Sequence, residues 1–361
     1  MKIGLALSGG GIRAAVFHLG VLKRIAESSD KWENISFISS VSGGSLCVAL
    51  LLQTAKNKWP DKNFFIEKSL PSIKNLLTNY STQRWYIASL CCHLYKYKAL
   101  SCVFKHLWGI KGSIKDLPDN PRWEICATSY ETGKCWRFSK KRMGDYLANY
   151  VVNPDYLIAD AITASASVPG LIGPVYISSK KYKWHKYENN KEKTLVVTKQ
   201  NLKRITLWDG GVYDNLGIEP LLKVDKLKDD IDFIIQSDAS RPLGIEKKFF
   251  KFKRPFYIPP FRLIDVISDQ TRAIRSRELI KFLQTNKNGI LAKMGNTVNE
   301  IYKKAKDPSP NIPSLSQEQV DMVNHFDTTL RKLTDEEFEL ILQHGYEVAT
   351  YTLKAYGYAD F

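Results

Sequence analysis

The chain has 361 residues, with 44% hydrophobic and 25% charged, which is ordinary globular composition and long enough to bury a large core. Its 53 Lys and Arg outnumber its 37 Asp and Glu, and the net charge of +16 predicts anionic partners such as nucleic acid or an acidic lipid surface. No apolar run approaches about 18 residues, so the sequence predicts no membrane-spanning helix.

The first element is a buried-type strand over Ile3 to Leu7, followed by a glycine-rich turn and a helix over Val16 to Ala26. No apolar leader precedes this strand, so we expect no signal peptide. The turn places Gly9, Gly10 and Gly11 before a helix start, where unobstructed N–H groups can bind an anion or an oxyanion. A Walker lysine and a Rossmann acid are both missing, so the sequence predicts no nucleotide and no other cofactor.

A second strand, Ile35 to Ile38, leads through the residues Ser39 to Ser45 into an apolar helix over Leu46 to Leu52. A serine at the apex of a strand–turn–helix segment lies at a helix N-terminus, which favours developing negative charge. Ser42 is therefore the candidate nucleophile, and Gly43 and Gly44 permit the close turn. Ser40 occupies the position of the first glycine in G-x-S-x-G, and an ordinary turn or helix cap is the alternative for this segment.

The segment from Trp59 to Asn120 is predicted to be a helical, lid-like insertion. Between Lys68 and Lys115 it has eight Lys and Arg but no Asp or Glu, and aromatic residues alternate with the lysines. This mixture favours an interfacial helix at a membrane over a nucleic-acid groove. A solvated helical subdomain with core aromatics is the alternative.

A hairpin is predicted from Trp123 to Ser139, then a small-residue helix from Asp155 to Ser167, then a polar loop or hairpin from Lys180 to Lys199. The strand Ile205 to Trp208 ends at Asp209, with Gly210 and Gly211 behind it. An aspartate there is a candidate active-site residue, and a plain Asp-Gly-Gly turn is the alternative. Ile231 to Gln236 is the last strand that the pattern predicts.

Residues 241–310 contain 16 Lys and Arg against 6 Asp and Glu, and aromatic residues from Phe249 to Tyr257 lie among the lysines. Such a loop is typical of a membrane surface contact. Amphipathic helices are predicted over Gln317 to Leu333 and Glu336 to Tyr356. We expect one domain over residues 1–361, with an insertion at about 59–120 and a basic helical extension at about 241–361.

Six cysteines are sparse in a chain of this length, which favours reduced thiols and a cytoplasmic location. No C-x-x-C or H-x-x-x-H spacing is present, so no metal site is predicted.

Four motifs, taken together and in order, resemble the patatin-like phospholipase family over about residues 1–240: they are Ser8 to Arg13, Val41 to Ser45, Ala164 to Pro169 and Asp209 to Asn215. The resemblance implies a three-layer α/β/α fold with a mainly parallel central sheet. It implies a catalytic dyad of Ser42 and Asp209, and an oxyanion loop of Gly9, Gly10, Gly11 and Arg13. Gly43, Gly44, Gly210 and Gly211 support the two turns.

The expected function is therefore hydrolysis of phospholipid or lysophospholipid esters at an anionic membrane surface, through an acyl-enzyme on Ser42. A nucleophile, a proton acceptor and oxyanion donors are what ester hydrolysis requires. The alternative is a lipid- or nucleic-acid-binding protein with little catalysis on a hydrolase scaffold, which the net charge favours.

Overall fold

The computed structural model describes residues 1–28, 30–188, 194–223, 226–228, 230–241, 243–244, 260–308, 312–359 and 361. Five parallel strands form the centre of its main sheet, in the order β14-β13-β1-β2-β3. These strands are β1 Ile3–Leu7, β2 Ile35–Val41, β3 Arg122–Ser129, β13 Phe233–Asp238 and β14 Gly289–Lys293. Their residues are almost all buried, which is why they read as continuous apolar runs.

Antiparallel strands extend the sheet beyond β3 in the order β4-β5-β6-β8-β9. They are β4 Cys135–Phe138, β5 Arg142–Asp145, β6 Asn149–Val152, β8 Trp184–Tyr187 and β9 Leu195–Thr198. A branch is formed by β7 Val175–Ser178 and β10 Arg204–Asp209, and β10 pairs with β3 so that Asp209 lies opposite Ala127. A separate small ladder joins β11 Leu222–Lys223 to β12 Lys226–Leu227.

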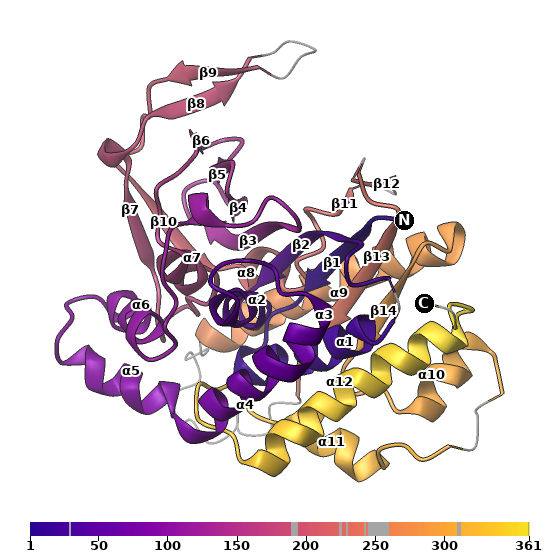
Figure 1. Cartoon of the computed structure of the whole chain (residues 1–361). Coiled ribbons are helices and arrows are strands. Elements are labelled where there is room, and N and C mark those ends of the chain that lie inside the picture. The colour runs from indigo at the N-terminus through magenta and orange to yellow at the C-terminus, as the bar shows by residue number, and fades with distance from the viewer. Residues whose placement is uncertain are drawn as a thin grey trace, which may run out of the picture.

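Alternate side chains of the parallel strands enter two different cores, as the period of a strand requires. Leu5 and Ile235 belong to the core that contains residues of α1 Gly11–Ala26, α2 Gly43–Thr54 and α12 Asp335–Ala355. Ala6 and Ile234 belong to a second core with Leu279 and Phe282 of α9 Pro260–Asn286. Helices therefore cover both faces (Figure 1), and the expected three-layer α/β/α fold is confirmed.

The segment between α2 and β3 is helical. It contains α3 Lys62–Phe64, η1 Phe65–Ser69, α4 Leu70–Asn79, α5 Thr82–Leu90, α6 Lys96–His106 and η2 Ile114–Asp116. Four of the eight basic side chains between Lys68 and Lys115 have acidic partners outside that stretch: Lys74 pairs with Glu339, Lys98 and Lys105 with Asp160, and Lys115 with Asp155. The acid-free composition therefore overstated the free positive charge of this segment.

The remaining helices are α7 Ile158–Ser165, η3 Ser179–Lys181, α8 Gly211–Asp214, α10 Val298–Ala305 and α11 Gln317–His325. The helix expected up to Leu333 ends at His325, because the next residues run extended past α1, where Thr329 O accepts a hydrogen bond from Ile12 N–H. The aromatic and basic loop from Phe249 to Tyr257 lies outside the described residues. In the ranges described, no helix combines the length and the apolar character needed to cross a bilayer.

Candidate active site

Ser42 occupies the turn between β2 and α2 with a backbone conformation that L-residues rarely adopt, φ 48° and ψ −113°. Such strain persists only where the surroundings enforce it, and it is common at functional sites. Helix α2 approaches β1 so closely that a Cβ on Gly44 would lie 2.4 Å from the carbonyl oxygen of Leu7. The turn therefore holds Ser42 at the first turn of α2, where the helix dipole favours negative charge.

A buried hydroxyl holds the backbone of Ser42 in place. The Ser42 N–H donates to Ser165 Oγ at 2.9 Å, and Ser165 Oγ donates its only proton to the carbonyl of Cys126 at 2.7 Å. Ser165 Oγ is also 2.9 Å from Ser45 Oγ, and because the Ser165 proton is already used, Ser45 is the donor in that bond. Ser165 therefore ties α7, α2 and β3 together at the nucleophile.

The hydroxyl chain continues to Ser40, the residue that replaces glycine in the motif. Since the Ser45 proton goes to Ser165, Ser45 Oγ accepts from Ser40 Oγ at 2.9 Å, and Ser40 Oγ accepts from Trp123 Nε1–H at 2.8 Å. Ser40, Ser45 and Ser165 are fully buried. A serine at position 40 thus has a defined structural role, as the link between the indole of Trp123 and the turn.

Asp209 is the last residue of β10, and α7 also holds its backbone. The Asp209 N–H donates to Ser167 O at 2.9 Å, and the Gly210 N–H donates to Ser165 O at 3.1 Å. Gly210 packs closely on β3, where an added Cβ would lie 2.4 Å from the carbonyl oxygen of Cys126. The last turn of α7 therefore sets the position of Asp209 as well as that of Ser42.

The carboxylate of Asp209 is buried. Burial raises the pKa of Asp209 to about 7, although the Gly211 N–H and the Ser42 hydroxyl each favour the ionised form. Oδ1 accepts the Gly211 N–H at 2.7 Å, whereas Oδ2 has no hydrogen bond of ordinary geometry within the described part of the chain. The Ser42 hydroxyl thus lies within electrostatic reach of a carboxylate that has a free acceptor oxygen and a pKa suited to a general base.

A cavity of about 510 Å³ joins these residues. Ser42, Asp209, Gly9, Gly10 and Gly211 all line it, so the cavity brings together five of the ten predicted site residues. Val168 and Pro169 form part of its wall, and α9 contributes the charged residues Arg262, Asp265, Asp269 and Arg272. No motif in the sequence indicates that α9 contributes to the site.

The glycine loop offers free donors at this cavity, but not at every glycine. The Gly9 N–H is taken by the carbonyl of Asn215 at 3.0 Å, and the Gly44 N–H by that of Ser8 at 3.0 Å. Among the described residues, the N–H groups of Gly10, Gly11 and Gly43 have no partner. Gly10 lines the cavity and Gly43 directly follows Ser42, so these two are the best placed donors for an oxyanion.

Arg13 does not join the oxyanion loop as expected. Its fully buried guanidinium donates to the carbonyls of Asn324 and Phe326 at 3.0 Å and of Ala239 at 2.9 Å. Burial, followed by the charge of Arg241, lowers the pKa of Arg13 to about 10. These contacts correct the expectation. Arg13 connects the glycine loop to the segments that contain Ala239 and Asn324, because its guanidinium supplies donors to their carbonyls, which would otherwise be unpaired.

No histidine lines the cavity among the described residues. His18 is fully buried, with Nδ1 2.7 Å from Ser237 Oγ and Nε2 2.9 Å from Ser8 O, and burial lowers its pKa to about 4. His344 accepts the Gly295 N–H, and burial lowers its pKa to about 4 as well. In the same described ranges, no three His, Cys, Asp or Glu side chains are grouped as metal ligands would be.

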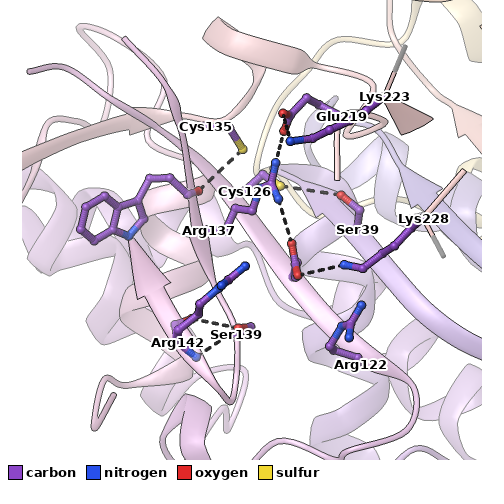
Figure 2. Close-up of polar contacts among 12 residues, drawn as sticks. Ser39, Arg122, Cys126, Cys135, Arg137, Ser139, Arg142, Glu219, Lys223 and Lys228 are labelled. Atoms are coloured by element: carbon purple, nitrogen blue, oxygen red, sulfur yellow. Dashed lines mark hydrogen bonds and ion pairs between the residues drawn. The ribbon is translucent and has the colours of Figure 1, made fainter. Parts of the chain in front are cut away.

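A second polar network supports β3 from the other side (Figure 2). Arg137 binds Glu219 and lies 3.6 Å from Glu124, which in turn lies 3.5 Å from Lys228. The Cys126 thiol is 3.7 Å from Ser39 Oγ within this network, while the Cys126 carbonyl serves Ser165. Through Cys126, β3 is thus fixed on both sides, next to the nucleophile turn.

Comparison with known proteins agrees with the fold and the motifs. The family model described as patatin-like phospholipase matches residues 5–222. A patatin-like phospholipase domain-containing protein of Neosartorya fischeri is 26% identical over 187 residues, covering 50% of this chain and 23% of that protein. One of Chaetomium globosum is 29% identical over 194 residues, covering 50% of this chain and 19% of its own length. This chain thus spans about a fifth of the length of these relatives.

Among solved structures, human GIVD cytosolic phospholipase A2 superposes with a TM-score of 0.56 at 13% identity, over 99% of this chain and 60% of that one. This likeness concerns the fold. Because the family model covers more than half of the sequence and includes both Ser42 and Asp209, the chain belongs to the patatin-like phospholipase family.

Proposed function

We propose that this protein is a lipid acyl hydrolase in which Ser42 and Asp209 form a catalytic dyad. The observation that carries the proposal is the shared cavity, which Ser42 enters from a strained turn and Asp209 from the end of β10, with no histidine lining it in the described ranges. A serine hydroxyl is a weak nucleophile unless a neighbouring base takes its proton. The free Oδ2 of Asp209 is the acceptor that the geometry offers.

In the proposed reaction, Ser42 Oγ attacks the carbonyl carbon of the ester while its proton passes to Asp209. The negative charge that develops on the carbonyl oxygen is stabilised by the N–H groups of Gly10 and Gly43 and by the dipole of α2. The tetrahedral intermediate then expels the alcohol, which takes the proton from Asp209. Water, deprotonated by Asp209, then attacks the acyl carbon, and Ser42 Oγ leaves with the proton from Asp209 as the fatty acid is released.

A phospholipid or lysophospholipid is the proposed substrate. The family description and the named phospholipase A2 of similar fold support a lipid ester, and a further structure of that human enzyme is a complex with methyl γ-linolenyl fluorophosphonate. The net charge of +16 supports peripheral contact with an anionic membrane, where such substrates reside.

The proposal is tested by assaying a panel of phospholipids, lysophospholipids and soluble short-chain esters with the wild type and Ser42→Ala. We expect release of fatty acid by the wild type only. Binding of lipid or nucleic acid that collapses with salt, without any turnover of a soluble ester, would instead establish the binding-protein alternative.

A further inference from the structure

Helix α5 turns large apolar side chains towards solvent. Trp85 is 53% exposed, Ile87 is 56% exposed, and Leu94, in the turn after the helix, is 93% exposed. Figure 1 shows α5 at the lower left edge of the molecule, away from the central sheet. Grouped apolar side chains on a surface mark a contact site rather than ordinary scatter, because their exposure to water is unfavourable.

The inward contacts of α5 fix which residues face outwards. Thr82 is buried and accepts a hydrogen bond from Trp108 Nε1–H at 2.9 Å. Tyr86, one turn later, donates its hydroxyl proton to the carbonyl of Leu171 at 3.1 Å. Residues three and four apart share one face of a helix, so Thr82 and Tyr86 define the inner side. Trp85 and Ile87 flank the outer side, and Arg84 lies between them.

The same contacts connect α5 to the wall of the cavity. Lys96, at the start of α6, donates to the carbonyl of Gly170 at 3.1 Å, next to the bond between Tyr86 and Leu171. Gly170 and Leu171 directly follow Val168 and Pro169, which line the cavity that contains Ser42. Leu171 is itself 66% exposed, so it adds to the apolar surface on the cavity side.

The charge around this surface is positive. Residues 82–96 contain no acid, and neither Arg84 nor Lys96 has a carboxylate within ion-pair distance among the described residues. Exposed Arg204 stacks over Tyr176 at 4.5 Å from the ring centre, and that ring meets Tyr95 at 5.8 Å. Apolar and aromatic side chains beside exposed cations match the interface of an anionic bilayer.

We infer that the α5 patch, defined as Trp85, Ile87, Leu94, Tyr95 and Leu171, is the surface by which the protein docks on an anionic lipid bilayer. The apolar side chains enter the acyl boundary, while Arg84 and Lys96 lie at the headgroup phosphates. The purpose of docking rests on the proposed function: Val168 and Pro169 line the cavity that contains Ser42, and Leu171 of the patch follows them in the same loop. Docking itself does not depend on catalysis.

Vesicle binding tests the inference directly. The full chain with Ser42→Ala is mixed with phosphatidylcholine vesicles, with or without phosphatidylglycerol, and bound protein is measured by flotation. Adding Trp85→Ser, Ile87→Ser and Leu94→Ser should weaken binding to the anionic vesicles about tenfold or more, since their burial drives insertion. The matched control is Met322→Ser on α11, because Met322 is 65% exposed but distant in sequence from the patch, and it should bind as before.

The charge contribution is tested in the same way. Arg84→Glu with Lys96→Glu should remove the preference for phosphatidylglycerol, whereas Lys303→Glu, at an exposed position on α10, should keep it. Unchanged binding by the triple apolar variant overturns the inference. So does a wild type that is dimeric in solution and becomes monomeric in the triple variant, because the patch would then be a contact between two copies.

Turnover separates this inference from the proposed function. With Ser42 intact, the triple variant should hydrolyse a soluble short-chain ester at the wild-type rate and lose activity only on vesicles. A loss on both substrates counts against a docking role. If the wild type hydrolyses no ester but binds anionic vesicles through the patch, the proposed function fails and the docking surface stands.

Discussion

The backbone N–H of Ser42 donates a 2.9 Å hydrogen bond to the side chain of Ser165, 123 residues further along the chain. Two residues later, the carbonyl of Ser167 accepts the N–H of Asp209 at 2.9 Å. One turn at the end of α7 therefore contacts the nucleophile and its proposed base. The distance between these two groups depends on this turn, and small errors in such a distance are costly to catalysis.

We predict that Ser165→Ala lowers kcat about ten- to a hundredfold with little change in KM, because the Ser42 N–H loses its acceptor and the turn relaxes. The measurement is steady-state turnover of a soluble ester. Ser167→Ala is the matched control, since Ser167 Oγ is equally buried on the same turn but, among the described residues, bonds only to Thr163 O at 2.6 Å. Equal losses in the two variants would mean that packing, not the bond to Ser42, is what matters.

The raised pKa of Asp209 predicts how the reaction depends on pH. With a pKa of about 7, the carboxylate loses its ability to accept the Ser42 proton as the pH falls through that value. We therefore expect kcat/KM for a soluble ester to rise across neutral pH and level off above it. Asp209→Asn should lose nearly all turnover at every pH. A flat profile from about pH 5 to 8 would exclude Asp209 as the base.

The same shift predicts a stability cost of the site. Unfolded chains release the Asp209 proton near 3.8, whereas the folded protein keeps it up to about 7, so stability falls as pH rises between these values. Asp209→Asn removes this titration and can still accept the Gly211 N–H. At about pH 8 we expect its free energy of unfolding to exceed that of the wild type by on the order of a few kcal/mol, which a higher unfolding temperature would show. The difference should vanish near pH 4.

Gly10 is predicted to be intolerant of a side chain. Its φ of 141° is unfavourable for any L-residue, and an added Cβ would lie 3.0 Å from Ala14 Cβ and from the carbonyl oxygen of Ala239. Gly10→Ala should move the free N–H and reduce kcat about a hundredfold or more. Gly133→Ala is the control. Gly133 also has a positive φ, but a Cβ added to it would meet no described atom within 4 Å. Full activity in a folded Gly10→Ala protein would remove this donor from the mechanism.

Arg13 is predicted to stabilise the fold without contacting substrate. Arg13→Ala leaves the buried carbonyl of Ala239 and two half-buried carbonyls without their donors, and we expect a loss of about 3 kcal/mol or more in the free energy of unfolding. Arg13→Lys should recover part of it, as lysine keeps the charge but lacks the planar fork. Protein that remains folded should still react with a fluorophosphonate. A stable variant that cannot be labelled would return Arg13 to the oxyanion loop.

The sequence predicted the elements that carry the site, because strand, turn and helix signals there are local. The runs that became β1, β2 and β10 were apolar, and glycines marked the turns after them. The short strand β14 was missed, since Gly289–Lys293 lies in a lysine-rich segment and becomes a strand only by pairing with β13. The rule that active residues follow parallel strands also singled out Asp209, but β10 is antiparallel to β3, so this rule does not explain the position of Asp209.

Contacts between distant segments could not be predicted. Ser165 lies in the predicted motif Ala164 to Pro169. Nothing near it in the sequence, however, indicates that its hydroxyl contacts Ser42 and Ser45. Arg13 follows the glycines directly, so its position suggested an anion contact, but the carbonyls that it binds come from residues more than 200 positions away. The charge of the helical insertion was likewise misjudged because its acidic partners lie elsewhere, as Lys105 with Asp160 shows.

The central claim is that Ser42 is the nucleophile, activated by Asp209. Its most direct test is labelling of the purified protein with an alkyl fluorophosphonate, followed by mass determination of the intact chain and of its peptides. We predict one adduct on the wild type, on the peptide that contains Ser42, no adduct on Ser42→Ala, and very slow labelling of folded Asp209→Asn. An adduct on another residue, or equal labelling of Ser42→Ala, would contradict the account.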